Sequence, residues 1–433
     1  MRHLDRYLQL QALQAAVTSP PHQDLSLSVV IPCLNESGLL PLLDQLQAGS
    51  MTDKAVEILV VINHPLDAPE AAKQKNINTL NDLKQWQANH GTPCFQVHAI
   101  SAFDLPVKTA GVGLARKTGM DEATRRFSET RNPEGVIVSL DADCRVSTSY
   151  LSGIINSFAA QPTMHAATIA YAHRLEEISD PQHLRGIISY ELFLRYIEMG
   201  WRYAELPYAF TSIGSCFAIR ADAYARHHGM NKRKAGEDFY FLHKLARERP
   251  LGHIDDICVY PSARMSSRTP FGTGQAVAEF CHNGQKGWLV STPDVFENLR
   301  NMNHSLPLLF KMETDQWLIQ LPKQMASYLV SQNVEQSVSK MRGHSAGTDS
   351  FKRHFYTWFD GLKAWRYVNS QSDSGIPVER AACRLLDMCN MPEKWNSSSA
   401  NESSAMLKLI RRFEQVDQID CPAGSSATQD TPA

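Results

Sequence analysis

Residues 135–144 have the sequence Gly135-Val136-Ile137-Val138-Ser139-Leu140-Asp141-Ala142-Asp143-Cys144. The aliphatic and β-branched run at positions 136–140 predicts one buried strand of a parallel sheet, and turn-forming residues precede it. Asp141 and Asp143 follow at the end of this strand. Ligands of open α/β sheets bind beyond the carboxyl ends of the strands, so we expect both carboxylates at the edge of a cleft.

The spacing of Asp141 and Asp143 places both side chains on one side of an extended chain. Two carboxylates this close repel each other unless a proton or a cation lies between them, and Mg²⁺ or Mn²⁺ is the usual oxygen-bound cation. We therefore expect Asp141 and Asp143 to hold a metal ion against a diphosphate. The alternative is a polar turn in which each aspartate bonds its own backbone.

The composition argues against several classes of protein. The 433 residues carry 43 basic and 45 acidic side chains, and a net charge of −2 offers no overall attraction to nucleic acid. The 9 cysteines include no Cys-x-x-Cys pair, which favours reduced thiols in a cytosol over a zinc site or a disulfide framework. The N-terminal 17 residues lack the apolar core of a signal peptide, and no segment reaches the roughly 18–20 apolar residues that span a bilayer. We expect a cytoplasmic protein, peripheral at most at the inner face of the membrane.

The order of the predicted elements indicates an α/β fold with two or three lobes. Strands predicted at 27–32, 56–63 and 95–100 alternate with helical stretches, which is the pattern of a doubly wound, mainly parallel sheet. Further predicted elements are helices at 1–17, 147–159 and 181–201, strands at 166–171, 213–220 and 258–260, and a helix that opens at 236. From about Asp294 the pattern becomes helical and amphipathic, and the residues from about Cys421 are small and polar, as in disordered tails.

Two helix starts carry charged residues with more than one interpretation. The glycine-rich stretch Lys108–Gly119 is no dinucleotide-binding fingerprint, because arginine occupies position 116 and no strand directly precedes it. Either Arg116 and Lys117 lie near a phosphate at the helix start, or the glycines only allow close packing. Glu237 and Asp238 begin another helix, where acids favour the helix dipole, so capping is an alternative to chemistry.

Four motifs in this order resemble those of the family 2 glycosyltransferases, which have a GT-A fold and use nucleotide sugars. They are Val30–Glu36, Gly113–Gly119, Asp141-Ala142-Asp143 and Gly236-Glu237-Asp238, within about residues 27–290. Each motif alone is weakly specific, so the resemblance lies in their order and spacing. It implies an α/β fold of GT-A type, with a doubly wound, mainly parallel sheet and a C-terminal helical appendage.

The resemblance also implies roles for individual residues. Asp238 would be the catalytic base, kept ionised by the positive end of its helix, and Glu237 would orient the acceptor or support Asp238. Asp141 and Asp143 would hold the ribose and a divalent cation, Mg²⁺ or Mn²⁺. The other donor-binding residues that it implies are Pro32, Asn35, Glu36 and Asn63 at the nucleoside, and Arg116 and Arg268 at the phosphates.

The implied organisation has five parts. Residues 1–24 form an N-terminal docking helix, 25–145 the nucleotide-sugar-binding half of the GT-A domain, 146–293 the acceptor-binding half, 294–420 a helical region and 421–433 a disordered tail. We expect the helical region to cover the acceptor side.

The implied reaction transfers a sugar, of hexosyl type, from a nucleotide-diphosphate sugar to an acceptor hydroxyl, with metal dependence and inversion. The Gln-x-x-Arg-Trp element of processive synthases is absent, as are membrane helices, so a single transfer is expected. Asn63-His64 stands where the family often has an aspartate pair. The acceptor, whether a glycan, a lipid-linked intermediate or a small molecule, is left open. Alternatives are a retaining transferase of the same fold and a non-catalytic, nucleotide-sugar-binding partner subunit. A nucleotidyltransferase on a similar sheet is a further alternative, but this chain has no glycine-rich loop with arginine or lysine directly after the first strand.

Overall fold

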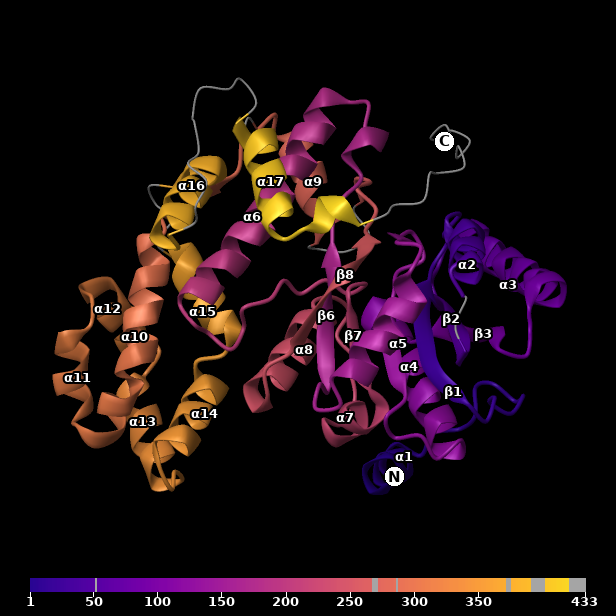
Figure 1. Ribbon diagram of the computed structural model, residues 1–433, viewed down its shortest axis with the longest axis horizontal. Helices are drawn as coiled ribbons and strands as arrows, with labels where there is room; N and C mark the ends of the chain where they lie inside the picture. Colours follow the sequence, from indigo (N-terminus) through magenta and orange to yellow (C-terminus); the bar gives the residue numbers. More distant parts are fainter. Residues whose placement is uncertain (51–52, 267–271, 286, 371–374, 391–401, 420–433) are drawn as a thin grey trace.

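The computed structural model describes residues 1–433 except 51–52, 267–271, 286, 371–374, 391–401 and 420–433. At its centre is an eight-stranded sheet of order β3-β2-β1-β4-β7-β6-β8-β5 (Figure 1). Its strands are β1 (Leu25–Cys33), β2 (Ala55–Pro65), β3 (Phe95–Leu105), β4 (Val136–Ser139), β5 (Arg145–Val146), β6 (Ala166–Tyr171), β7 (Phe217–Arg220) and β8 (Gly252–Tyr260). The α/β class predicted from the sequence is confirmed.

The sheet is mainly parallel. β2 pairs in parallel with β1 and β3, β1 with β4, and β6 with β8. β7 runs antiparallel between β4 and β6, and the short β5 runs antiparallel to β8. From β1 the chain winds outward to β2 and β3 and then returns to β4 on the other side of β1. The carboxyl ends of β1 and β4 therefore form the topological switch point, where open α/β sheets bind their ligands.

Alternate side chains of the strands pack into two separate cores, one on each face of the sheet. In β1, Leu27, Val29 and Ile31 belong to one core and Val30 to the other. The first core is covered by α2 (Leu39–Ala48), α3 (Glu70–His90) and α5 (Tyr150–Ala160), and the second by α4 (Val112–Glu129), α1 (Arg2–Gln11), α7 (Ala221–Arg226) and α8 (Glu237–Glu248). Helices on both faces make the fold doubly wound and consistent with the expected GT-A type.

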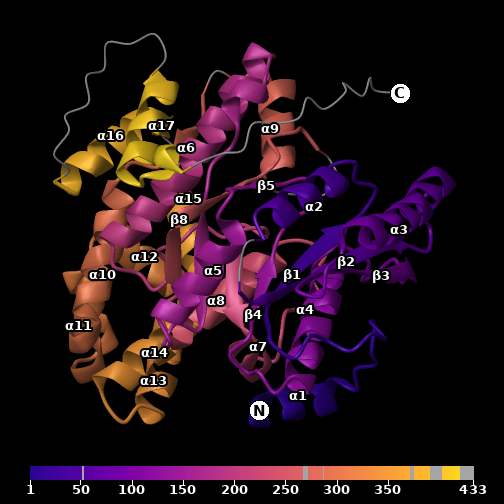
Figure 2. The ribbon, with the colours of Figure 1, turned by 45° about the vertical axis from the view of Figure 1, so that its right-hand side comes forward.

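The C-terminal part of the described chain is helical and packs against the long helix α6 (Pro181–Tyr203). Figure 2 shows α16 and α17 beside α6, at the end of the molecule far from the N-terminus. The remaining elements are α9 (Thr273–His282), α10 (Asp294–Lys311), α11 (Thr314–Gln320), α12 (Lys323–Ser331), α13 (Val334–Gly343), α14 (Thr348–Trp358), α15 (Gly361–Ser370), α16 (Val378–Met388), α17 (Glu402–Phe413), the 3-10 turns η1 (Leu175–Glu177) and η3 (Val416–Gln418), and the small sheet of β9 (Leu289–Val290) with β10 (Ile376–Pro377).

A buried ion cluster fixes α17 to α6. Glu191 of α6 is fully buried and is bound by Arg195 at 2.8 Å and by Arg411 of α17 at 2.7 Å. His173 donates its backbone N–H to the same carboxylate at 3.0 Å. A buried carboxylate needs such partners, because a charge left unpaired in the interior costs several kcal/mol. Both arginines hold the pKa of Glu191 well below its usual range, against the effect of burial.

Several predicted boundaries were wrong. The strand predicted at 213–220 begins only at Phe217, and the helix predicted at 147–159 begins at Tyr150. The N-terminal helix ends at Gln11 rather than near residue 17, because Ala12 takes a left-handed conformation with φ 47°. The proposed disordered tail, 421–433, lies outside the described residues.

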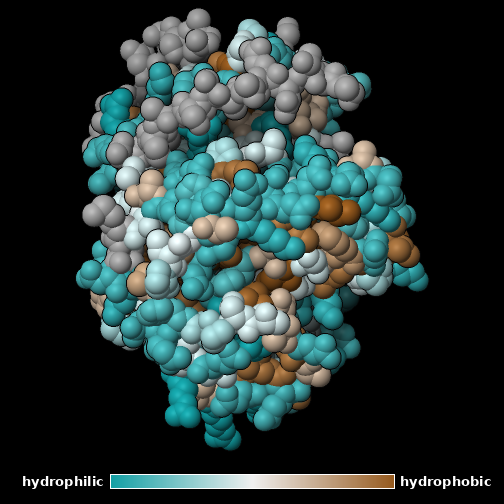
Figure 3. Space-filling view, turned by 90° about the vertical axis from the view of Figure 1, so that its right-hand side faces the viewer, coloured by the Kyte–Doolittle hydropathy of each residue, from teal (hydrophilic) through white to brown (hydrophobic). Residues whose placement is uncertain are grey.

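The surface over β3 and its neighbours is mainly polar. Figure 3 shows this end of the molecule, with apolar residues in small groups among hydrophilic ones. β3 is one of the two edge strands of this sheet, and its second half, from Ser101, is partly exposed. Across the described ranges, no helix combines the length and the apolar character needed to cross a membrane.

Candidate functional site

The loops that follow β1 and β4 meet at the switch point. Residues 34–38 connect β1 to α2, and residues 140–144 connect β4 to β5. At Gly38 an added Cβ would lie 3.2 Å from the backbone oxygen of Ala142, so the two loops are in close contact. The structure therefore brings the predicted Asn-Glu and Asp-Ala-Asp motifs together.

Three carboxylates gather in these loops, and we call Glu36, Asp141 and Asp143 the acid cluster. Arg264, which follows β8, donates hydrogen bonds to both carboxylate oxygens of Glu36, at 2.8 and 2.5 Å, and lies 3.0 Å from Asp143. Burial and then Asp141 raise the pKa of Asp143 to about 6; Arg264 lowers it, and Glu36 raises it further. The acid cluster has three carboxylates, and Arg264 offsets only one of their charges. Such a cluster favours a further cation.

Arg116 connects this cluster to the start of α8. Its guanidinium is 2% exposed, donates to Asp141 at 2.6 Å and also pairs with Glu237. Glycine is required beside it, since a Cβ at Gly113 would lie 2.1 Å from the backbone oxygen of Arg233. The close-packing interpretation of the glycines is thus confirmed at Gly113, and a phosphate-binding role of Arg116 stays a prediction.

Asp238 lies one position further along α8, near enough to Arg116 and Asp141 for both charges to shift its pKa. Gly236 precedes the helix with φ 69°, a left-handed conformation that glycine adopts without strain. Asp238 accepts a hydrogen bond from the backbone N–H of Phe239 at 2.8 Å. Burial raises the pKa of Asp238; Arg116 lowers it, and Asp141 raises it. The expectation that the positive end of the helix keeps this carboxylate ionised stays a prediction, and burial acts against it in the folded chain.

Tyr190 of α6 lies within electrostatic range of Asp238. Burial raises the pKa of Tyr190 to about 12, Thr273 lowers it through a hydrogen bond, and Asp238 raises it. The charge of Asp238 therefore reaches the phenol of Tyr190.

The predicted nucleoside residues lie at the ends of β1 and β2. Pro32 is buried within β1 opposite Val61, and Asn35 takes a left-handed conformation with φ 53°, which asparagine tolerates. Asn76 of α3 accepts from the backbone N–H of Asn35 at 3.0 Å and donates to the backbone oxygen of Asn63 at 3.0 Å. One amide thus holds the ends of two strands together.

His64 occupies the position where an aspartate pair would be expected. Its ring stacks on Phe103 with 4.6 Å between centroids, and its Nδ1 lies 3.1 Å from the side-chain nitrogen of Asn76. The buried imidazole is held on both sides, so this strand end presents a ring and an amide in place of two carboxylates.

The acid cluster suits a hard divalent cation that arrives with phosphate. In the described residues, no three histidine, cysteine, aspartate or glutamate side chains are arranged to hold a metal ion. Mg²⁺ is commonly bound by one or two carboxylates, with phosphate and water supplying the other oxygens. Asp141 and Asp143, with side chains 35% and 25% exposed, fit this arrangement.

Arg264 and Asn76 were not among the residues predicted from the sequence. Arg268 was chosen as the basic residue after the last strand, and it lies outside the described residues. The position of Arg264 was a usable signal, because a basic residue that follows the carboxyl end of β8 lies at the ligand-binding edge of the sheet. Asn76 lies inside a polar helical stretch and gave no distinct signal.

No protein-family model and no curated protein matches the chain. Among solved structures, S. aureus TarS residues 1–349 in complex with UDP-GlcNAc is 13% identical, with a TM-score of 0.39, over 77% of this chain and 91% of that one. The mannosyltransferase PcManGT from Pyrobaculum calidifontis, in complex with GDP-Man and Mn²⁺, is 12% identical, with a TM-score of 0.34, over 96% and 94%. Likeness at this level does not establish a shared function.

Proposed function

We propose that the protein is a glycosyltransferase that moves a sugar from a nucleotide-diphosphate sugar to an acceptor hydroxyl, in one metal-dependent, inverting transfer. The observation that carries this proposal is the convergence of the acid cluster and Asp238 at the switch point of the sheet. This reaction requires a pair of carboxylates that can bind a cation and a separate carboxylate that can accept a proton. The acid cluster and Asp238 would supply them.

The donor would bind across the ends of β1, β2 and β4. Pro32, Asn35 and Asn63 would line the nucleoside pocket, with Glu36 and Asp141 towards the ribose. Arg264 lies within reach of the acid cluster and is a phosphate contact in this proposal, together with Arg116 and Arg268. A divalent cation held by Asp141 and Asp143 would offset the charge that builds up on the leaving diphosphate.

Asp238 would act as the general base. The acceptor oxygen forms a bond to the anomeric carbon while the bond from that carbon to the diphosphate oxygen breaks, and the electron pair leaves with the diphosphate. The hydroxyl proton passes to Asp238, whose raised pKa makes it a better proton acceptor than an ordinary aspartate. Glu237 would hold Arg116 in place beside Asp141, a positioning role supported by its ion pair.

The test has a binding part and a product part. A panel of nucleotide sugars is screened by thermal shift with and without Mn²⁺, and one donor should raise the melting temperature more with Mn²⁺ present. Asp143→Ala should lose this Mn²⁺-dependent part and retain more of the affinity for the free nucleoside. NMR of the product should show an anomeric configuration opposite to that of the donor. No stabilisation by any sugar nucleotide would contradict the proposal, and a retained configuration would contradict its inverting mechanism.

A further inference from the structure

A cavity of about 720 Å³ lies between the sheet and the helical region, and we call it the α8–α14 cavity. The end of α6, the end of α8, the start of β8 and the first turns of α14 all contribute to its wall. Its volume falls in the range of small-molecule sites, about 300–1,000 Å³. α8 has 12 residues, so its end at the cavity lies about 18 Å from its start beside Asp238. The cavity is therefore separate from the candidate active site.

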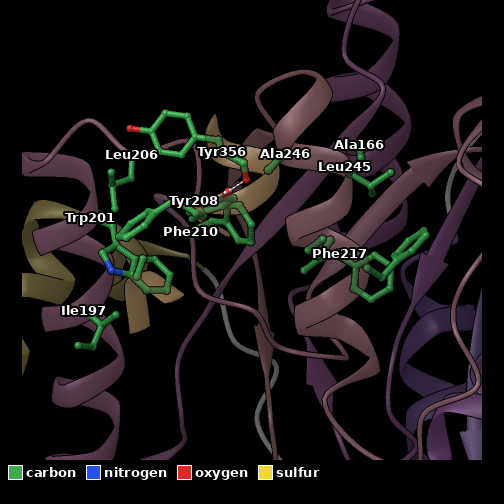
Figure 4. Packing of buried hydrophobic residues seen from close by; sticks show 14 of the residues in the cluster. Ala166, Ile197, Trp201, Leu206, Tyr208, Phe210, Phe217, Leu245, Ala246 and Tyr356 are labelled. Carbon is green, nitrogen blue, oxygen red and sulfur yellow. Dashed lines mark hydrogen bonds between the residues drawn. The ribbon is translucent and has the colours of Figure 1, made fainter. Parts of the chain in front are cut away.

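Part of the wall is apolar and rigid. Leu206, Phe210 and Tyr356 contribute to it, and Figure 4 shows them gathered around Tyr208. The Tyr208 hydroxyl donates to the backbone oxygen of Tyr356 at 2.6 Å, which fixes α14 against the segment that follows α6. A preformed apolar wall of this kind can bind the carbon skeleton of a small organic ligand.

Three of the four acids of the cavity wall have a basic side chain as partner. Glu198 accepts from Arg202 at 2.7 Å. Glu205 lies 3.3 Å from Arg300, and Glu248 lies 3.2 Å from His227. Asp349, in the first turn of α14, is the remaining acid of the wall.

The cations show the opposite pattern. Within the described part of the chain, Arg247, Lys352 and Arg353 pair with no carboxylate, although all three line the cavity. Arg247 alone could be explained by the dipole of α8, because it lies in the last turn of that helix. Lys352 and Arg353 are the fifth and sixth residues of α14, beyond its first turn, so the helix dipole does not account for them. Three cations without an ion-paired carboxylate, from two helices, therefore line one partly apolar cavity.

We propose that the α8–α14 cavity binds a small phosphate monoester with a sugar-sized organic part. Arginine and lysine side chains are suited to a phosphate group, and the apolar wall suits the carbon skeleton. This site is distinct from the donor site and does not depend on the reaction proposed above.

The probe is glucose 6-phosphate, and its binding to the full-length protein is measured by calorimetry. Glucose and inorganic phosphate, the two parts of the probe, are measured separately for comparison. We expect glucose 6-phosphate to bind more tightly than either part. The double variant Lys352→Ala/Arg353→Ala should lose about tenfold or more in affinity. Its matched control, Lys323→Ala/Arg366→Ala, changes one exposed lysine and one exposed arginine outside the cavity and should bind like the parent.

Three results would overturn the proposal. The first is no binding of glucose 6-phosphate up to about 10 mM, and the second is equal affinity in the Lys352→Ala/Arg353→Ala variant. The third is binding that Asp143→Ala abolishes while the double variant keeps it, because the anion would then lie at the acid cluster. Parental glucose 6-phosphate binding by Asp143→Ala supports two separate sites, whatever the outcome of the transfer assays. If the parent binds vesicles that contain phosphatidic acid but does not bind soluble glucose 6-phosphate, the cavity is a membrane contact and not a small-molecule site.

Discussion

Arg264 and Glu36 form a two-pronged ion pair, at 2.8 and 2.5 Å, although 228 positions separate them in the chain. This guanidinium places one positive charge among three carboxylates at the switch point of the sheet. In the proposed reaction it would compete with the metal ion for the same oxygens and would lie near the donor phosphates.

Arg264→Met should tighten the binding of Mn²⁺ in the absence of donor, by about fivefold at a pH near 8, because one competing charge leaves the acid cluster. Binding of the sugar nucleotide should weaken instead, since a phosphate contact is lost. Both affinities are measured by calorimetry, with Arg226→Met as an exposed control far from the cluster. Weaker Mn²⁺ binding in Arg264→Met would show that Arg264 organises the carboxylates and does not compete with the metal.

Asp143→Asn should stabilise the free protein at neutral pH by about 1 kcal/mol while removing metal-dependent donor binding. The folded pKa of Asp143 is raised to about 6 from an ordinary 3.8, so its ionisation destabilises the folded state. The loss of folding stability caused by this ionisation develops as the pH rises from about 4 to about 6, and it persists at higher pH. The gain of Asp143→Asn over the parent should therefore be small near pH 4 and full near pH 7, as measured by urea unfolding. The exposed Asp67→Asn should show no such dependence, and an equal difference at both pH values would contradict the charge assignment.

Asp238→Asn should lower turnover by about 10²-fold or more with little change in donor affinity, because the amide keeps the shape but cannot accept a proton. A capping role would instead lower stability by about 1 kcal/mol and leave the turnover of the folded fraction intact. Melting temperature and turnover are measured on one preparation, beside the exposed control Asp256→Asn. Parental turnover in Asp238→Asn would remove Asp238 from the reaction.

Glu237→Gln should destabilise the protein by about 2–3 kcal/mol, because the buried Arg116 loses one of its two carboxylates. Donor affinity should fall as well, since Arg116 is freed to move away from Asp141. Urea unfolding gives the first quantity and calorimetry the second, with the exposed Glu335→Gln of α13 as control. If Glu237→Gln unfolds like the parent, the ion pair contributes no net stability.

Truncation at about Asn301 should cost solubility as well as activity. It would remove α17, and with it Arg411, from the fully buried Glu191. The point variant Arg411→Met should destabilise the full chain by about 3 kcal/mol for the same reason. A soluble truncation with full transfer to its acceptor would show that the helical region is dispensable.

The sequence by itself determined the α/β class, the winding of the sheet and the position of Asp141 and Asp143 at a strand end. These features depend on local patterns, such as the apolar run 136–140 and the alternation of strands with helices, and local patterns are visible along the chain. It did not predict that β4 would end at Ser139 or that β7 would begin as late as Phe217, because pairing with neighbouring strands sets those ends.

Only the tertiary structure decided the partners of the acids. Arg264 reaches Glu36 and Asp143 because the sheet brings the end of β8 to the loops after β1 and β4, and Arg116 reaches Glu237 because α4 packs beside the start of α8. The pKa of Asp238 rises because burial outweighs the helix start and the nearby guanidinium, and burial is a property of the folded chain. Charge pairing and desolvation depend on distances in space, so no spacing along the sequence could have given their balance.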